Sequence, residues 1–319
     1  MLSNRKLWSA VLGLAAATLL ASSPARAVEP DKLVPADADA VVVFNVRQAL
    51  DSPLVKTYAL DMIKQQMKGN DQIDKIMEAA GVDPLKDIDS VLFANSGAPP
   101  KNEWLIVAHG KFNPEKFHPA AEGYAKKNPK EMKYTGEGKD RVYEVINNGS
   151  TVYAALADGS TLAMASSKEF LQATLKKGPG KLNKDMQAAL DKVKGGQESM
   201  WMALVITDDL RKSLASNPQT KDLAEKLDSV TGNLNVGSDI QLSVLIHTTD
   251  ADAAQKVAKQ INGLKPLLGL LANGNEQAKP FIDLLSEHLQ VKSKEKAATI
   301  DLKLTEVQLK KAITPEKDK

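Results

Sequence analysis

One order of strand-like and helix-like segments runs through this chain twice, and this repetition constrains the fold more than any other feature. In each half, an apolar run leads into a helix-like stretch, two more strand-like segments follow, and a strand with a short helix closes the half. The matched strand-like segments are 41–46 with 201–206, 88–91 with 227–230, 104–109 with 241–246 and 161–164 with 299–304, and the closing helices are 168–177 and 306–313. Strands joined by hairpins or by helices in mixed order are typical of α+β folds. We therefore predict two related α+β halves from an internal duplication, each a mostly antiparallel sheet with helices packed on one face.

Turn and capping residues support this division into strands and helices. Asn148-Gly149 separates two strand-like runs and is typical of a two-residue β-hairpin. Asn113 stands before Pro114, which is the usual order of a helix N-cap and the first helical residue. Thr305 and Gln308 have the spacing of a capping box, so we expect the last helix to begin there.

The first 27 residues predict an export signal. Arg5 and Lys6 give it a positive start, residues 7–21 form a short apolar run, and Ala25-Arg26-Ala27 offers a signal peptidase site. We expect cleavage after Ala27 and a mature protein in the periplasm or outside the cell. The breaker-rich segment 176–181 marks the boundary between the halves. The expected organisation is a signal peptide at 1–27, a first half at 28–178, a second half at 179–313 and a charged tail at 314–319.

Composition excludes several classes of partner and site. Without Arg5, Lys6 and Arg26, 39 of the 42 Lys and Arg residues remain against 40 Asp and Glu residues. Such a balance argues against a nucleic-acid partner, which requires clustered positive charge. The chain has no cysteine, which excludes thiolate metal sites, Fe–S clusters and a cysteine nucleophile. No second segment approaches the length of a membrane span, so we expect no transmembrane span after signal cleavage.

A search for reactive motifs identifies no catalytic residue, no metal site and no cofactor. The four histidines lack metal-ligand spacing, and no Gly-x-Ser-x-Gly nucleophile motif occurs. His109 and His247 stand near the ends of corresponding strands, where a shared site and two unrelated strand-end residues are the alternatives. Paired carboxylates that meet only in space remain an alternative, because sequence does not reveal spatial pairing.

The segment 261–272 is the strongest candidate for a binding surface, because it is apolar on nearly every side and too short to span a bilayer. Lys265, Pro266 and Gly269 interrupt it and suggest a bend. It could form a helix buried between the halves, a wall of a lipid-sized groove or a surface that docks a partner. The candidate ligand or partner residues are Ile261, Leu264, Leu267, Leu268 and Leu271.

Three short phrases resemble a group of exported planctomycete-type proteins of unknown function. These phrases are the Leu-x-Pro-Ala-Asp start at 33–37, Pro84-Leu-Lys-Asp-Ile-Asp-Ser-Val91 and Phe112-Asn-Pro-Glu-Lys-Phe117. The resemblance supplies no catalytic residue, cofactor or substrate, and it favours a protein that is not an enzyme.

Together these observations favour an exported, non-catalytic binding or interaction protein. The alternatives are a carrier of an apolar ligand such as lipid, and a hydrolase with spatially assembled carboxylates. The partner is an unidentified protein or apolar ligand, and the sequence leaves the oligomeric state undetermined.

Overall fold

Two apolar runs form the strands at the centre of the structure, β1 (Ala38–Phe44) and β8 (Met200–Val205). The computed structural model describes residues 31–66, 77–97, 103–147, 149–177, 180–193, 198–218, 220–272 and 279–313. The other strands are β2 (Ile88–Ser96), β3 (Glu103–Gly110), β4 (Met132–Thr135), β5 (Val142–Asn147), β6 (Ser150–Asp158), β7 (Thr161–Ala165), β9 (Leu227–Val236), β10 (Asp239–Thr248), β11 (Gln290–Lys294) and β12 (Ala297–Thr305). The helices are α2 (Val46–Asp51), α3 (Leu60–Gln66), α5 (Pro84–Asp87), α6 (Pro114–Lys127), α7 (Lys168–Lys177), α8 (Lys184–Leu190), α9 (Asp208–Ser216), α10 (Lys221–Ala224), α11 (Ala251–Ala272), α12 (Lys279–His288) and α13 (Glu306–Ile313), with a π-helical turn η1 (Val55–Ala59) and a 3-10 turn η3 (Gly138–Asp140).

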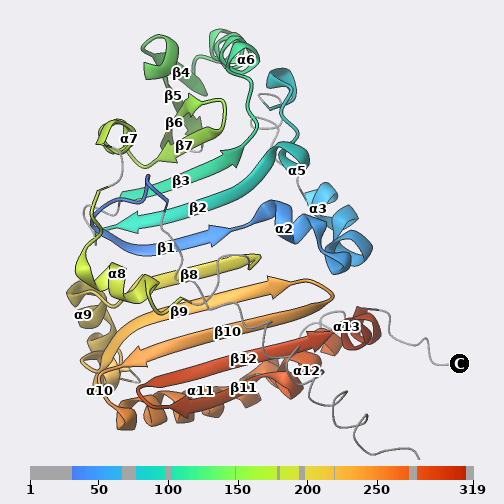
Figure 1. Cartoon of the computed structure of the whole chain (residues 1–319), viewed down its shortest axis with the longest axis vertical. Helices are drawn as coiled ribbons and strands as arrows, with labels where there is room; N and C mark the ends of the chain where they lie inside the picture. Colours follow the sequence, from blue (N-terminus) through green and yellow to red (C-terminus); the bar gives the residue numbers. More distant parts are fainter. Residues whose placement is uncertain are drawn as a thin grey trace, which may run out of the picture.

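The described strands form one continuous 12-stranded sheet in the order β11-β12-β10-β9-β8-β1-β2-β3-β7-β6-β5-β4 (Figure 1). The neighbouring strands pair antiparallel, for example Val42 of β1 with Phe93 of β2 on one side and with Met202 of β8 on the other. The predicted α+β class with a largely antiparallel sheet is confirmed. The sheet continues from one half to the other through the β1–β8 pair.

Each half places its strands in the same order outward from this central pair. The first half runs β1-β2-β3-β7-β6 and the second runs β8-β9-β10-β12-β11, with β5 and β4 added at the outer edge of the first. A helical connection, α6 or α11 with α12, follows the third strand in both halves. The repeated order predicted from the sequence is therefore present, while an origin by duplication stays a prediction.

The turn and capping predictions hold in the described residues. Gly149 has a φ of 80° between β5 and β6, a left-handed conformation that glycine adopts without strain, whereas Asn148 lies outside the described residues. Asn113 caps α6 by accepting a hydrogen bond from the Lys116 N–H. At the last helix, the Thr305 N–H donates to Gln308 Oε1 at 2.8 Å and the Gln308 N–H donates to Thr305 Oγ1 at 3.4 Å.

Helices lie on both faces of the sheet, which differs from the expected packing on one face. On one face, Met186 and Leu190 of α8 and Leu171 of α7 pack against Val41 and Trp201 in the central core. On the opposite face, α6 covers the outer strands of the first half and α11 covers those of the second half. Helices therefore cover the central strands on the α7–α8 side, whereas α6 and α11 cover only the outer strands of the opposite face.

Candidate functional site

The strand registers align apolar residues across one face of the central sheet. Ile106 pairs with Phe93, Phe93 with Val42, and Val42 with Met202. The row continues through Gly232 of β9 to Val244 of β10. We call this surface the apolar floor, and its residues are Trp104, Ile106, Phe93, Val42, Phe44, Met200, Met202, Leu204, Val230, Leu234 and Val244.

Side chains of the apolar floor remain in contact with solvent, whereas their neighbours on the opposite face are buried. Phe93 is 37% exposed and Phe44 is 39% exposed, and the other floor residues are partly exposed. Leu92, which precedes Phe93 in β2, is 2% exposed against the α7–α8 side. This alternation within single strands shows that helices cover one apolar face of the central strands and leave the other open.

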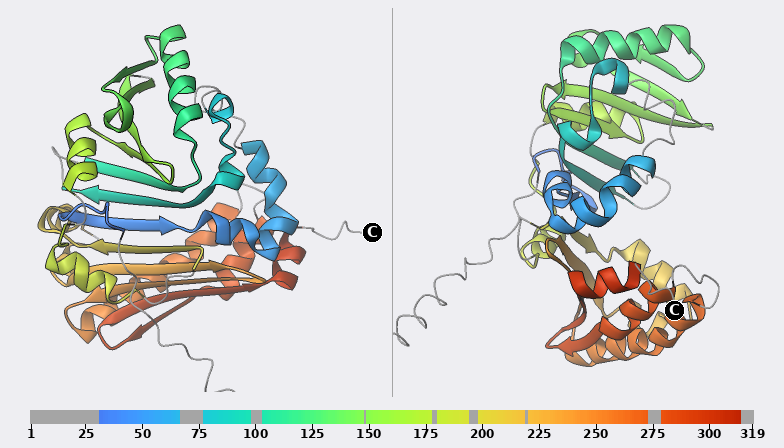
Figure 2. Two further views of the ribbon diagram at one scale, coloured as in Figure 1. Left: turned by 45° about the horizontal axis from the view of Figure 1, so that its top comes forward. Right: turned by 90° about the vertical axis from the view of Figure 1, so that its right-hand side faces the viewer.

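Helices border the apolar floor at both ends of the sheet. At one end, Phe117 and Ala121 of α6 are buried against the outer strands of the first half. At the other end, Ala253 and Val257 of α11 are buried against Ala298 and neighbouring residues of the second half. Figure 2 (right) shows α6 and the α11–α13 group projecting from the same side of the sheet. The floor therefore lies between two helical walls, α6 on the first half and the α11–α13 group on the second.

The two remaining edges of the floor differ from each other. Near the end of β1, Leu54 and Tyr58 of the η1 region pack with Leu302 and Leu309 of the second half and close that edge. Near the start of β1, a hollow of about 310 Å³ extends the floor toward α9. Its lining comprises Asp39, Ala40, Asn95, Gly97, Leu204, Val205, Thr207, Asp209, Leu210 and Ser213. This hollow gives the floor one polar end.

Asp39 sets the electrostatics of this polar end. Its carboxylate accepts a hydrogen bond from the Gly97 N–H at 3.1 Å. Burial raises the pKa of Asp39, and the neighbouring Asp37 and Asp209 carboxylates add to this rise against the effect of the Gly97 hydrogen bond. A second carboxylate of the hollow, Asp209, forms an ion pair with Lys212. The end of the floor therefore carries negative charge and hydrogen-bonding groups.

The residues predicted from the sequence all fall within α11. Ile261 packs partly buried against the core beneath this helix. Leu264 and Leu267 are 55% and 49% exposed, and the side chains of Leu268 and Leu271 lie outside the described residues. The helix continues through Pro266 to Ala272 as one element, so the proline does not end it. The apolar segment is thus placed in a helix that forms one wall of the floor.

The apolar floor itself was not predicted. Its strands read as continuous apolar runs such as Val41-Val-Val-Phe44, and a run of this kind is typical of a strand buried on both faces. The only sequence signal for the floor is that every second residue of these apolar runs, such as Val42 and Phe44, is also apolar. In the described part of the chain, no helix covers these residues. Which part of the sheet stays uncovered depends on where α6 and α11 pack, and the sequence pattern does not give these positions.

The described histidines lie in separate hydrogen-bonded pairs. His109 Nε2 lies 2.6 Å from Asp31 Oδ2, and His247 Nε2 lies 2.9 Å from Thr231 Oγ1. Their strands, β3 and β10, are five strand spacings apart, which is about 24 Å. His109 and His247 therefore do not form the shared site that the sequence left open. Among the described residues, no group of three or more His, Asp or Glu side chains could hold a metal ion.

The pKa values of these groups reflect their local partners. The hydrogen bond to Asp31 raises the pKa of His109 against the opposing effect of burial. Burial alone would raise the pKa of Asp31. Hydrogen bonds from His109 and from the Leu33 N–H outweigh this effect and hold the pKa of Asp31 below its usual value. Burial lowers the pKa of His247. The His109–Asp31 pair fastens the start of the described chain to β3.

Two further polar pairs join α6 to residues 141 and 143 of the first half. His118 Nδ1 lies 2.7 Å from the Tyr143 hydroxyl, and Arg141 pairs with Glu122 at 3.0 Å. Burial raises the pKa of Tyr143 to about 12, although the Arg141 charge opposes this shift. Phe117 packs edge-on against both His118 and Tyr143. This cluster is part of the packing of α6 on the sheet.

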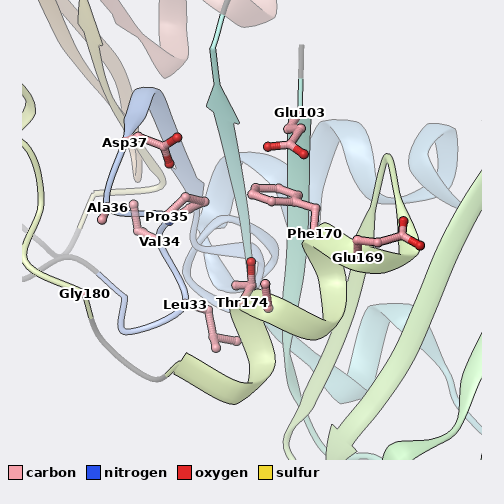
Figure 3. A pocket seen from close by; sticks show the side chains of 11 residues that line it. Leu33, Val34, Pro35, Ala36, Asp37, Glu103, Glu169, Phe170, Thr174 and Gly180 are labelled. Carbon is pink, nitrogen blue, oxygen red and sulfur yellow. The ribbon is translucent and has the colours of Figure 1, made fainter. Parts of the chain in front are cut away.

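A further hollow, of about 360 Å³, lies between segment 33–37 and α7 (Figure 3). Phe170 and Thr174 of α7 line it, together with Pro35 and with the carboxylates of Glu103 and Glu169. Phe170 also packs against the central core formed with α7 and α8. This hollow therefore belongs to the covered side of the sheet and is separate from the apolar floor.

Comparison with known proteins gives a weak structural likeness. The chain is similar to TP0453 in crystal form III, with a TM-score of 0.48 and 11% sequence identity over 90% of this chain and 98% of that chain. Crystal form I of TP0453 gives a TM-score of 0.47 with 11% identity over 90% of this chain and 96% of that chain. No protein-family model and no curated protein sequence matches this chain. Among the described residues, no helix has the length and apolar character needed to span a membrane.

Proposed function

We propose that this protein is an exported, non-catalytic binding protein that holds one elongated apolar ligand, such as a lipid acyl chain, on the apolar floor. The observation that carries the proposal is the row from Ile106 through Phe93, Val42 and Met202 to Val244, which is apolar and partly exposed. A contiguous apolar row that stays partly exposed is typical of a binding surface.

The dimensions of the floor suit a hydrocarbon chain. The row crosses six strands, and five strand spacings amount to about 24 Å. The hydrocarbon core of a bilayer is about 30 Å thick, so a chain from one leaflet is about 15 Å long. The floor can therefore accept a full acyl chain along the row.

The walls favour a slender ligand over a flat protein surface. Because α6 and α11 project from the same side of the sheet, they would hold a broad, rigid partner away from Phe93 and Val42 (Figure 2, right). A single chain fits between the walls, and its polar end can reach Asn95 and Thr207 in the hollow near α9. Delivery of such a ligand needs no catalytic residues.

A binding titration with a fluorescent long-chain alcohol tests this proposal, because the carboxylates Asp39 and Asp209 at the polar end of the floor would repel a negatively charged head group. Met202→Trp adds a large side chain to the floor, and we expect it to weaken binding of the probe at least tenfold with little change in melting temperature. Gln241→Trp adds the same side chain to an exposed position on β10 that lies outside the apolar floor, and we expect unchanged binding. Absence of probe binding by the unmodified protein, or equal losses in the two variants, would contradict the proposal.

A further inference from the structure

The hollow near α9 lies one step along the strands from the central row of the apolar floor. Asn95, Ala40 and Leu204 line it, and they pair with one another across β2, β1 and β8. Each stands two residues along its strand from a member of the row that contains Val42. Side chains two residues apart point to the same face of a sheet and are about 7 Å apart. The polar end of a chain held on the floor can therefore lie in the hollow.

A β-bulge in β1 gives the hollow its carboxylate. Ala38 and Ala40 pair with adjacent residues of β2, so Asp39 is the one extra residue between them. Val41 is buried on the α7–α8 side, and regular alternation would direct Asp39 to that covered side as well. A bulge changes the direction of the side chain of the extra residue. Asp39 instead lines the hollow, where its carboxylate accepts a hydrogen bond from the Gly97 N–H.

The hollow has an excess of negative charge. Its charged lining residues are Asp39 and Asp209, and Asp209 pairs with Lys212 at 3.2 Å. Among the described residues, Asp39 forms no ion pair, and the charged neighbours that shift its pKa are the carboxylates of Asp37 and Asp209. Burial and these two charges raise the pKa of Asp39, so its surroundings disfavour its negative charge. A cation placed in the hollow would stabilise that charge.

The positive groups at the start of α9 have partners other than Asp39. Lys212 pairs with Asp209, and Arg211 donates hydrogen bonds to backbone carbonyls outside the hollow. The first turn of α9 also contains Asp208 and Asp209, whose charges offset the partial positive charge of a helix N-terminus. The electrostatic attraction of Asp39 is therefore available to a ligand.

The other polar groups of the hollow suit a hydrogen-bond donor. Asn95 offers an amide oxygen and Thr207 offers a hydroxyl oxygen beside the Asp39 carboxylate. A primary ammonium has three N–H donors and no acceptor, whereas a carboxylate head group has acceptors alone and the same charge as Asp39. A hydrogen bond between an ammonium and a carboxylate is also stronger than one between neutral groups. Charge and hydrogen bonding thus both favour an ammonium.

We propose that the hollow near α9 selects a protonated amino head group, so that the ligand on the apolar floor is an amine with a long hydrocarbon chain. Asp39 accepts the charged hydrogen bond, and Asn95 and Thr207 supply further acceptors. This inference rests on the proposed function, because the chain of the same ligand lies on the floor.

Competition against the fluorescent long-chain alcohol tests the head-group preference. The competitors are dodecylamine, dodecanol and dodecanoate at neutral pH, which share one chain length and differ in head group. For the unmodified protein, dodecylamine should displace the probe at a concentration about tenfold lower than dodecanol, because it adds a charge-assisted hydrogen bond. Dodecanoate should be the weakest of the three.

Asp39→Asn removes the charge and keeps an oxygen acceptor for the Gly97 N–H. This variant should bind dodecanol as the unmodified protein does, and its preference for dodecylamine should disappear. Asp61→Asn is the matched control, because the Asp61 side chain is 94% exposed on α3 and does not line the hollow. The control should keep the full preference, and circular dichroism establishes that both variants are folded.

The outcomes separate this inference from the proposed function. Binding of dodecanol without a preference for dodecylamine would overturn the head-group assignment and leave the floor as the binding surface. A preference that persists in Asp39→Asn, or that falls equally in Asp61→Asn, would overturn it as well. Failure of the unmodified protein to bind any of the three chains would contradict the proposed function and this inference together.

Discussion

Truncation of Phe93 is the most informative single substitution in the apolar floor. Phe93 is 37% exposed, and a phenylalanine side chain presents about 200 Å², so about 70 Å² is available for contact with a ligand. At about 25 cal/mol per Å², this contact contributes about 2 kcal/mol to binding. Phe93→Ala should therefore weaken the binding of a long-chain probe ten- to thirtyfold.

Leu92 provides a matched control in the same strand. It is 2% exposed and faces the core on the opposite side of the sheet. Leu92→Ala should lower the free energy of unfolding by about 2–5 kcal/mol through the loss of buried methyl groups. Because Leu92 does not line the floor, the folded fraction of this variant should keep its affinity for the probe.

The assay combines a probe titration with chemical denaturation of both variants at a temperature well below their melting points. We expect the affinity for the probe to fall mainly in Phe93→Ala, whereas the free energy of unfolding falls in both variants. Equal affinities for Phe93→Ala and the unmodified protein would refute the assignment of the floor as the binding surface. A similar loss of affinity in Leu92→Ala would show that binding follows overall stability instead.

Three further predictions follow from local contacts and from the sequence. His109→Asn should remove a pH-dependent stabilisation: because the pKa of His109 is raised and that of Asp31 is lowered, the pair contributes fully between about pH 4 and 6.5 and loses its effect as pH rises through the raised His109 pKa. The difference in melting temperature between the unmodified protein and this variant should shrink from pH 6.5 to pH 9, and a constant difference would contradict this account. Thr305→Ala should lower the free energy of unfolding by about 0.5–2 kcal/mol in urea denaturation, because it removes the side-chain cap of α13, and an unchanged midpoint would argue against the cap. Sequencing of the N-terminus of the exported protein should begin at Val28, and a start at Met1 would contradict export with cleavage after Ala27.

The sequence predicts the class of fold and the order of its elements because these depend on local patterns. Alternation and apolar runs mark the strands, and the Asn113 and Thr305 caps mark where α6 and α13 begin. The pairing of β1 with β8 joins residues about 160 positions apart, such as Val42 and Met202, and local patterns carry no information on this contact. One continuous sheet therefore emerges only from the structure.

The sequence likewise predicts one part of the candidate site and leaves the other part unpredicted. The sequence identifies the apolar helix that includes Ile261 and Leu264, because twelve residues without a polar face are unusual. It does not reveal that Phe93 and Val42 face solvent, because an apolar run looks the same whether or not a helix covers it. Exposure here depends on the separation of α6 and α11, which follows from the length of the whole sheet.

Native mass spectrometry of the protein purified from its own host tests the central claim most directly. We expect a population heavier than the bare chain by the mass of one acyl-chain lipid. This population should be absent from Met202→Trp and retained in Gln241→Trp. A spectrum that contains the bare chain alone in gentle conditions, or the same bound lipid in the Met202→Trp variant, would contradict the claim that the apolar floor holds an apolar ligand.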